Sequence, residues 1–94
     1  MSGSMQAAAT WQRVNHLPFQ TIDEVTLVVN PARREVHLLN ETASRVWELC
    51  ASPHTMDELL DTLGGEYDAP RDELLREVTE LVDGLRDKSL LVTR

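Results

Sequence analysis

The sequence predicts an α+β fold, in which a small N-terminal antiparallel sheet of two to three strands packs on three helices. Apolar and polar residues alternate over residues 24–29 and 34–39, which is the periodicity of half-buried strands. After Leu39 the apolar residues recur every three to four positions, as they do along helices with one buried face. Two short helices before a longer one, with a small sheet beside them, make the predicted fold winged helix-turn-helix-like.

The two alternating segments are expected to form a β-hairpin. Between them, Asn30–Arg33 has proline at its second position, which suits a type I turn. The apolar residues of each strand share one face, and they are Val25, Leu27 and Val29, then Val36 and Leu38. This alternation puts His37 on the exposed side of its strand. Residues 11–16 are expected to add a third strand.

Three helices are expected after residue 39, and each begins at a start signal. Asn40 is a good N-cap for the first, and Thr55 with Glu58 forms a capping box for the second. The second should stop at Gly64–Gly65. Pro70 suits the first position of the third, which should run to Lys88. The expected core residues have helical spacing: Ala43, Val46, Trp47, Cys50, Met56, Leu59, Leu60, Leu63, Leu74, Val78, Leu81 and Leu85. The short apolar tail 90–92 should dock back on this core.

Length and composition narrow the class of protein. A chain of 94 residues supports one domain, expected over residues 11–94, whereas residues 1–10 are expected to be disordered. Met1–Ser4 resembles an expression remnant. The net charge of −7 argues against a nucleic-acid partner, and no apolar run is long enough for a membrane span. The single Cys50 excludes an internal disulfide framework and favours a cytoplasmic location.

The reactive side chains predict no enzyme, no metal site and no cofactor. The three histidines are not spaced as metal ligands, and Cys50 lies on an apolar stripe, which favours a packing role. Leu75 and Val82 form a second apolar flank of the long helix. This flank is either part of a wide core face or the wall of a shallow groove. A groove beside an open strand edge can accept an extended peptide by strand addition.

Several segments together resemble the PqqD family. His37–Ala43 followed by Val46–Leu49 resembles its "LLN-E-T-A…I-W-E-L" signature. Further matching segments are Thr55–Leu59, Glu66–Asp68 before the proline-started helix, Glu77–Val78 and Lys88–Leu91. The resemblance covers residues 22–92, and the joint order of the segments is more specific than any one of them. Glu77 stands where the family often has Asp, and Ser89 where it often has Gly.

This resemblance implies a RiPP recognition element, which is a peptide chaperone. Such a protein binds the leader of a ribosomally made precursor peptide as an extra strand between its third strand and third helix. It presents the precursor to a modifying enzyme, such as a radical-SAM protein or a leader peptidase. Carried over here, the strand is Arg34–Leu39 and the helix is residues 70–88.

The resemblance, together with the second apolar flank of the long helix, yields a set of candidate peptide-binding residues. They are Arg34, Glu35, Val36, His37, Leu38, Leu39, Arg71, Leu75, Val82 and Arg86. The arginines, with Arg76, are expected to select acidic leader residues, and Leu75 and Val82 to form the pocket. On this basis Val82→Asp should weaken peptide binding, whereas Glu80→Ala should not.

Two other functions fit parts of the sequence. The order of elements suits a winged-helix DNA-binding regulator, whose binding would depend steeply on salt. The long helix argues against this, because its four basic and six acidic residues give a net charge of −2. The second alternative is a structural dimerisation module. An unpaired edge strand would let two copies of the chain pair as a homodimer.

Overall fold

The computed structural model describes residues 9–94, so the expected expression remnant at residues 1–4 lies outside the described residues. Thr10 falls within the segment expected to be disordered, but the structure places it in a strand. Its N–H donates to the Arg94 carbonyl at 3.0 Å, and its carbonyl accepts the Arg94 N–H at 3.0 Å. The expected disorder is therefore wrong at Thr10, because the two ends of the described chain pair with each other.

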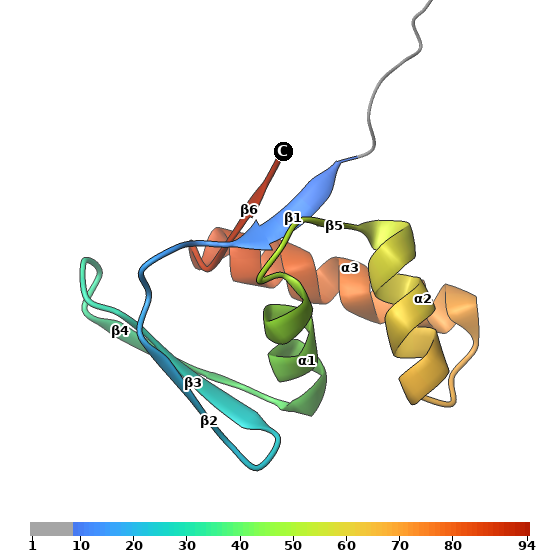
Figure 1. Cartoon of the computed structure of the whole chain (residues 1–94), viewed down its shortest axis with the longest axis horizontal. Helices are drawn as coiled ribbons and strands as arrows, with labels where there is room; N and C mark the ends of the chain where they lie inside the picture. Colours follow the sequence, from blue (N-terminus) through green and yellow to red (C-terminus); the bar gives the residue numbers. More distant parts are fainter. Residues whose placement is uncertain (1–8) are drawn as a thin grey trace, which may run out of the picture.

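The fold is α+β, as predicted, and has three helices and two three-stranded antiparallel sheets within residues 9–94 (Figure 1). One sheet has the order β2-β3-β4, with β2 (Phe19–Ile22), β3 (Val25–Asn30) and β4 (Glu35–Leu39). The other has the order β5-β1-β6, with β1 (Thr10–Arg13), β5 (His54–Thr55) and β6 (Leu91–Thr93). The helices are α1 (Glu41–Leu49), α2 (Met56–Glu66) and α3 (Arg71–Asp87). The strand expected at residues 11–16 thus exists as β1, but it belongs to a second sheet that was not predicted.

The β2-β3-β4 sheet faces the core with its less apolar side. Thr26, Val28 and Asn30 of β3 are buried, whereas Val36 and Leu38 of β4 are 61% and 72% exposed. Leu39 is buried where the chain enters α1. Side chains alternate between the two faces of a strand, so His37, two residues before Leu39, also points inward. The expectation of an exposed His37 is therefore wrong, and only 15% of its side chain is exposed.

The expected turn between the strands of the hairpin forms. The Arg33 N–H donates to the Asn30 carbonyl at 3.2 Å, which closes the turn. Arg34 follows with a left-handed φ of 54° and lies outside the strand. The expected strand Arg34–Leu39 therefore begins one residue later, at Glu35.

The helix ends follow the sequence signals closely, with two exceptions. Asn40 Oδ1 accepts the Ala43 N–H at 2.9 Å, and Thr55 and Glu58 form the expected capping box. Pro70 is the N-cap of α3 and not its first residue. The expected stop at residues 64–65 is wrong because both glycines have ordinary negative φ, so α2 continues to Glu66.

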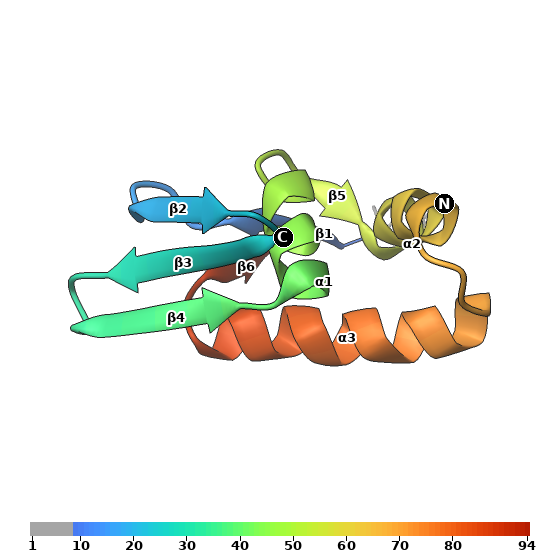
Figure 2. The ribbon, with the colours of Figure 1, turned by 90° about the horizontal axis from the view of Figure 1, so that it is seen from below.

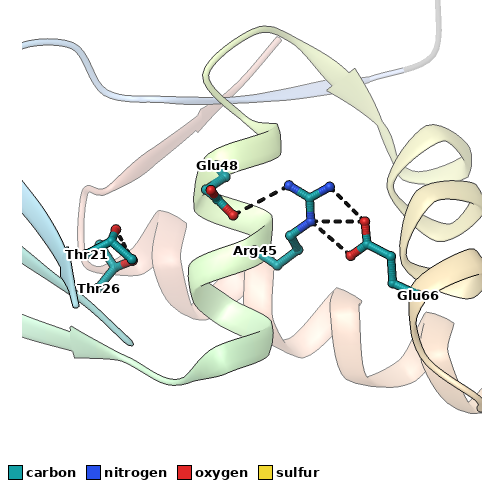
Figure 3. Close-up of polar contacts among 5 residues, drawn as sticks. All are labelled: Thr21, Thr26, Arg45, Glu48 and Glu66. Atoms are coloured by element: carbon teal, nitrogen blue, oxygen red, sulfur yellow. Dashed lines mark hydrogen bonds and ion pairs between the residues drawn. The ribbon is translucent and has the colours of Figure 1, made fainter. Parts of the chain in front are cut away.

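A pair of charged residues joins α1 to the end of α2 (Figure 3). Arg45 donates from Nη2 and Nε to the Glu66 carboxylate, at 2.7 and 2.9 Å, and its Nη1 lies 3.4 Å from Glu48 Oε1. These bonds from Arg45 hold the pKa of Glu66 below its ordinary value, and the same bonds raise the pKa of Arg45. Because the pair is exposed to solvent, we expect it to orient the two helices more than it stabilises them.

The core is one cluster between the helices and the two sheets, and most of the predicted residues lie in it. Met56 and Leu81 are half-buried, and the other ten predicted residues are buried. Leu90 and Leu91 of the tail are buried as expected, whereas Val92 is 39% exposed. The core also contains Val82, with no exposed area, which the sequence had assigned to the groove.

Candidate peptide-binding groove

A hollow of about 260 Å³ lies between β4 and α3. Figure 2 shows the C-terminal end of α3 beside the end of β4 that leads into α1. Its walls are apolar and polar in similar measure, and they are formed by Leu38, Leu39, Asn40, Ala43, Glu80, Leu81, Gly84, Leu85 and Lys88. Gly84 widens the hollow, because a Cβ added there would meet no atom within 4 Å. A hollow of this size accepts one or two apolar side chains.

One side of the groove is the open edge of a sheet, because β4 is the last strand in the order β2-β3-β4. The Val29 N–H donates towards β2, to the Pro18 carbonyl at 2.9 Å. Successive residues of a strand direct their N–H and C=O groups to opposite sides, so those of Val28 point towards β4, where His37 is its partner. The next residues along β4, Val36 and Leu38, therefore direct their N–H and C=O groups to the open edge. A peptide strand placed there would find two donors and two acceptors.

Ser44 of α1 fixes the end of β4 at the groove. Its Oγ accepts the Thr26 N–H at 2.9 Å and donates to the Leu39 carbonyl at 3.0 Å. The hydroxyl thus stands between β3 and β4 where a ladder bond would otherwise form. Beside it, the hydroxyls of Thr21 and Thr26 lie 2.9 Å apart and join β2 to β3 (Figure 3). Because Ser44 is buried, these backbone groups have no easy access to water.

We expect Ser44→Ala to lower the free energy of unfolding by about 2–3 kcal/mol, because two buried backbone groups lose their partner. Urea denaturation followed by circular dichroism measures this loss. Thr79→Ala removes a hydroxyl from an exposed position of α3 and should change stability by less than about 0.5 kcal/mol. An Ser44→Ala protein as stable as the Thr79→Ala protein would contradict the bridging role.

A second contact holds the other end of β4 beside α3. Ser89 follows α3 with a left-handed φ of 62°, and the Leu90 N–H donates to the Leu85 carbonyl at 2.9 Å. This is the helix ending that glycine usually provides. The Ser89 Oγ accepts from Arg33 Nη1 at 3.1 Å, so the serine ties the β3–β4 turn to the end of α3. A glycine at this position could not make that bond.

The structure brings only part of the predicted site together. Leu38 and Leu39 line the groove, and Val36 lies on the open edge. Arg71 lies at the far end of α3, where it donates to Asp61 at 2.9 Å. Arg86 is placed over the ring of Trp11, 5.8 Å from its centroid, on the side of the second sheet. The expected cluster of arginines is therefore not formed around the groove.

The two expected pocket residues on α3 also lie elsewhere. Val82 is fully buried, so its side chain is not available to a ligand, and Leu75 is 43% exposed but outside the groove. Leu81, assigned to the core by its spacing, lines the groove. Glu80 lines it too, so Glu80→Ala is not the neutral control expected from the sequence. The residues 80–81, 84–85 and 88 recur at helical spacing, which is the signal that could have identified this face.

Cys50 has the packing role expected from its position. It is completely buried, and burial raises the pKa of its thiol to about 11, so the thiol stays protonated at neutral pH. Among residues 9–94, no three His, Cys, Asp or Glu side chains come together as metal ligands. Over the same residues, no helix combines the length and apolar character needed to cross a membrane.

A second hollow, of about 250 Å³, lies on the other side of α1. Its walls carry more acidic than basic side chains, and they are formed by Thr21, Asp23, Glu24, Glu41, Ser44, Arg45, Glu48, Glu66 and Tyr67. The one arginine in its wall is already bound to Glu66 and Glu48. Burial and the nearby Glu41 raise the pKa of the Tyr67 hydroxyl. This hollow lies next to the β2–β3 turn, away from the open edge of β4.

The fold places the open edge of β4 beside one face of α3, an arrangement that can accept an extended peptide as an added strand. The family described as coenzyme PQQ synthesis protein D (PqqD) matches residues 25–91. A "PqqA binding protein" of Bradyrhizobium diazoefficiens strain USDA 110 is 31% identical over 75 residues, which are 80% of this chain and 71% of that protein. The chain therefore belongs to the PqqD family.

Two solved structures share the fold. TbiB1 in complex with the TbiA(β) leader peptide has a TM-score of 0.78 and 21% identity, over 85% of this chain and 93% of that one. Lasso peptide synthetase B1 complexed with its leader peptide has a TM-score of 0.69 and 19% identity, over 87% of this chain and 96% of that one. Both similarities extend over almost all of the fold described above.

Proposed function

We propose that this protein is a non-catalytic RiPP recognition element of the cytoplasm. It binds the leader of a ribosomally synthesised precursor peptide and presents it to a modifying enzyme, such as a radical-SAM protein or a leader peptidase. The observation that carries the proposal is the open edge of β4 beside a groove whose floor includes Leu81 and Leu85. Family membership, the PqqA-binding relative and the two leader-bound structures of the same fold support it.

The leader would bind as a strand antiparallel or parallel to β4. Four main-chain bonds to Val36 and Leu38 are worth about 0.5–1.5 kcal/mol each. Ordering the leader costs about 1–2 kcal/mol per residue, so the bonds alone do not bind it. The surplus comes from apolar leader side chains that enter the groove over Leu81 and Gly84. The backbone thus supplies affinity for any strand, and the groove selects the sequence.

The size of the groove at Gly84 gives a direct test. Gly84→Leu places a side chain in the groove from a Cβ position that meets no atom within 4 Å, so leader binding should weaken at least about tenfold, or 1.4 kcal/mol. Calorimetry would use the leader of a precursor encoded beside this protein's own gene. The PqqA peptide and the TbiA(β) leader serve as comparison probes.

Gly65→Leu is the matched control. A Cβ at Gly65 also meets no atom within 4 Å, and Gly65 lies in α2, outside the groove. Both substitutions replace a helical glycine and should slightly stabilise the fold. Equal leader affinity of the two variants would contradict the groove. So would amide shifts, on leader binding, that miss both β4 and residues 80–88.

The winged-helix DNA-binding alternative gains no support. Glu80 lines the groove together with Lys88, so the face of α3 beside β4 carries no net positive charge. Such a face would not be attracted to phosphates. The likeness to a winged helix in the order of elements stays a prediction about the fold.

A further inference from the structure

The outer face of the β2-β3-β4 sheet is almost entirely apolar. Residues directly opposite each other share a face, so the register places Gln20, Ile22, Val25, Leu27, Val29, Val36 and Leu38 on this side. Six of these seven residues are apolar. Helix α1 packs on the opposite, inner face, and no element of the described chain covers the outer one (Figures 1 and 2).

The exposed area is large for a chain of this size. The exposed fractions are 64% for Ile22, 39% for Val25 and 38% for Leu27, besides those of Val36 and Leu38. They correspond to a patch on the order of 500 Å², near the upper end of the about 300–600 Å² that is typical of the largest patch on a monomer. The face is smaller than the about 800 Å² per partner of a standard interface, which is the size range of weaker association.

The two ends of this face carry opposite charges. The β2–β3 turn contains Asp23 and Glu24, and the β3–β4 turn contains Arg33 and Arg34, of which Arg33 lies 3.4 Å from the Glu35 carboxylate. Because β3 runs from one turn to the other, the acidic and basic pairs lie at opposite ends of the strands. An apolar face with one acidic and one basic end is complementary to a second copy whose strands run in the opposite direction, because the acidic end of each copy then meets the basic end of the other.

We propose that two copies of this chain associate through their outer sheet faces. The two-fold axis runs across the strands, so that β3 stacks on β3 of the partner in the opposite direction. Each Arg33–Arg34 turn then lies over the Asp23–Glu24 turn of the other protomer. The alternative two-fold axis, parallel to the strands, would put like charges together and is disfavoured. The apolar residues provide the affinity, and the turns set the orientation.

This association leaves the proposed leader site open. The dimer buries the outer face, including Leu38 at the rim of the groove, whereas the other groove residues lie between the β4 edge and α3. Two leaders could therefore bind to one dimer, both on the β4 side, because the axis stacks β4 over β4. The inference does not depend on the proposed function, and a monomer that binds leader would contradict only the dimer.

Sedimentation equilibrium of the full chain over the micromolar range is the first test. We expect a mass that approaches twice the 10.6 kDa of one chain. Leu27→Arg, at the centre of the face, should weaken association at least tenfold. Val92→Arg is the matched control, because Val92 has the same exposure on the other sheet and should leave association unchanged. A wild-type mass of one chain at every concentration would overturn the proposal and leave the face to a different protein.

Charge reversal tests the orientation. Arg34→Glu and Glu24→Arg should each weaken the dimer, and the double variant should recover most of the loss. No recovery would overturn the antiparallel arrangement.

Cross-linking covers the case in which Leu27→Arg does not fold. Leu27→Cys should give a linked dimer with a bismaleimide that spans the about 10 Å between stacked sheets. Val92→Cys should not, and the native Cys50 is buried and should stay unreacted. Linkage through Val92→Cys but not Leu27→Cys would place the contact elsewhere and contradict the proposal.

Discussion

The Val82→Asp protein is expected to be unfolded at room temperature. Val82 has no exposed area and lies in the core with Val78 and Leu85. An aspartate there loses the apolar contacts of valine and buries a carboxyl group without a partner. Such burial costs several kcal/mol even after the carboxyl takes up a proton. The total loss, about 5 kcal/mol or more, is comparable to the whole stability of a domain of this size.

Leu75→Asp on the same helix is the matched control. Leu75 is 43% exposed, so the new carboxylate stays in water and the cost should be within about 1 kcal/mol. Circular dichroism and urea denaturation of the two variants would decide between the two environments. A Val82→Asp protein that unfolds as cooperatively as Leu75→Asp would show that Val82 lies at the surface.

Positions 81 and 82 show where a helical pattern stops being informative. Apolar residues occur at 74, 75, 78, 81, 82 and 85 of α3, so they cover a wide arc around the helix. The sequence does not tell which part of this arc faces the core, to within the about 100° that separates neighbouring residues. The side that faces the core is set by where α2 and β6 pack, which is a tertiary property. The result is that Val82 is inside and Leu81 lines the groove, the reverse of the expected order.

The strands show the same limit in a different form. Alternation correctly indicated the β3–β4 hairpin, but it could not tell which face is covered. The buried Leu39 at the entry to α1 decides this, and it leaves Val36 and Leu38 outside. The second sheet was not predicted because its partners are distant in sequence, with Thr10 opposite Thr55 and Trp11 opposite Thr93.

Features that depend on a few neighbouring residues were predictable. The caps at Asn40 and Thr55 each bond to a residue three positions later. The position of the candidate site, between the strand before α1 and the long helix, came from the resemblance to the PqqD family. The lining residues did not, because they depend on how α3 is rotated about its own axis.

The Trp47→Ala protein is expected to lose about 3–5 kcal/mol of unfolding free energy, the usual range for emptying a buried aromatic site. Trp47 is 1% exposed and is one of the largest buried side chains of the described chain. Its ring meets that of Phe19 edge to face, with centroids 5.6 Å apart, and so joins α1 to β2. The Arg13 guanidinium lies 5.3 Å from the centroid of the Trp47 ring, which adds a contact to the last residue of β1. Thermal and urea denaturation would measure the loss.

Trp47→Phe separates the packing of the ring from its polar atom. The Nε1–H of Trp47 is buried and has no hydrogen-bond partner among residues 9–94, so removing it forfeits no bond. Phenylalanine keeps the contact with Phe19 and leaves a smaller cavity, so its cost should be about 1–2 kcal/mol. A loss below about 1 kcal/mol for Trp47→Ala would contradict the central place of this side chain. A Trp47→Phe protein as unstable as Trp47→Ala would instead show that Nε1 has a partner, since ring packing alone predicts a clear difference between the two.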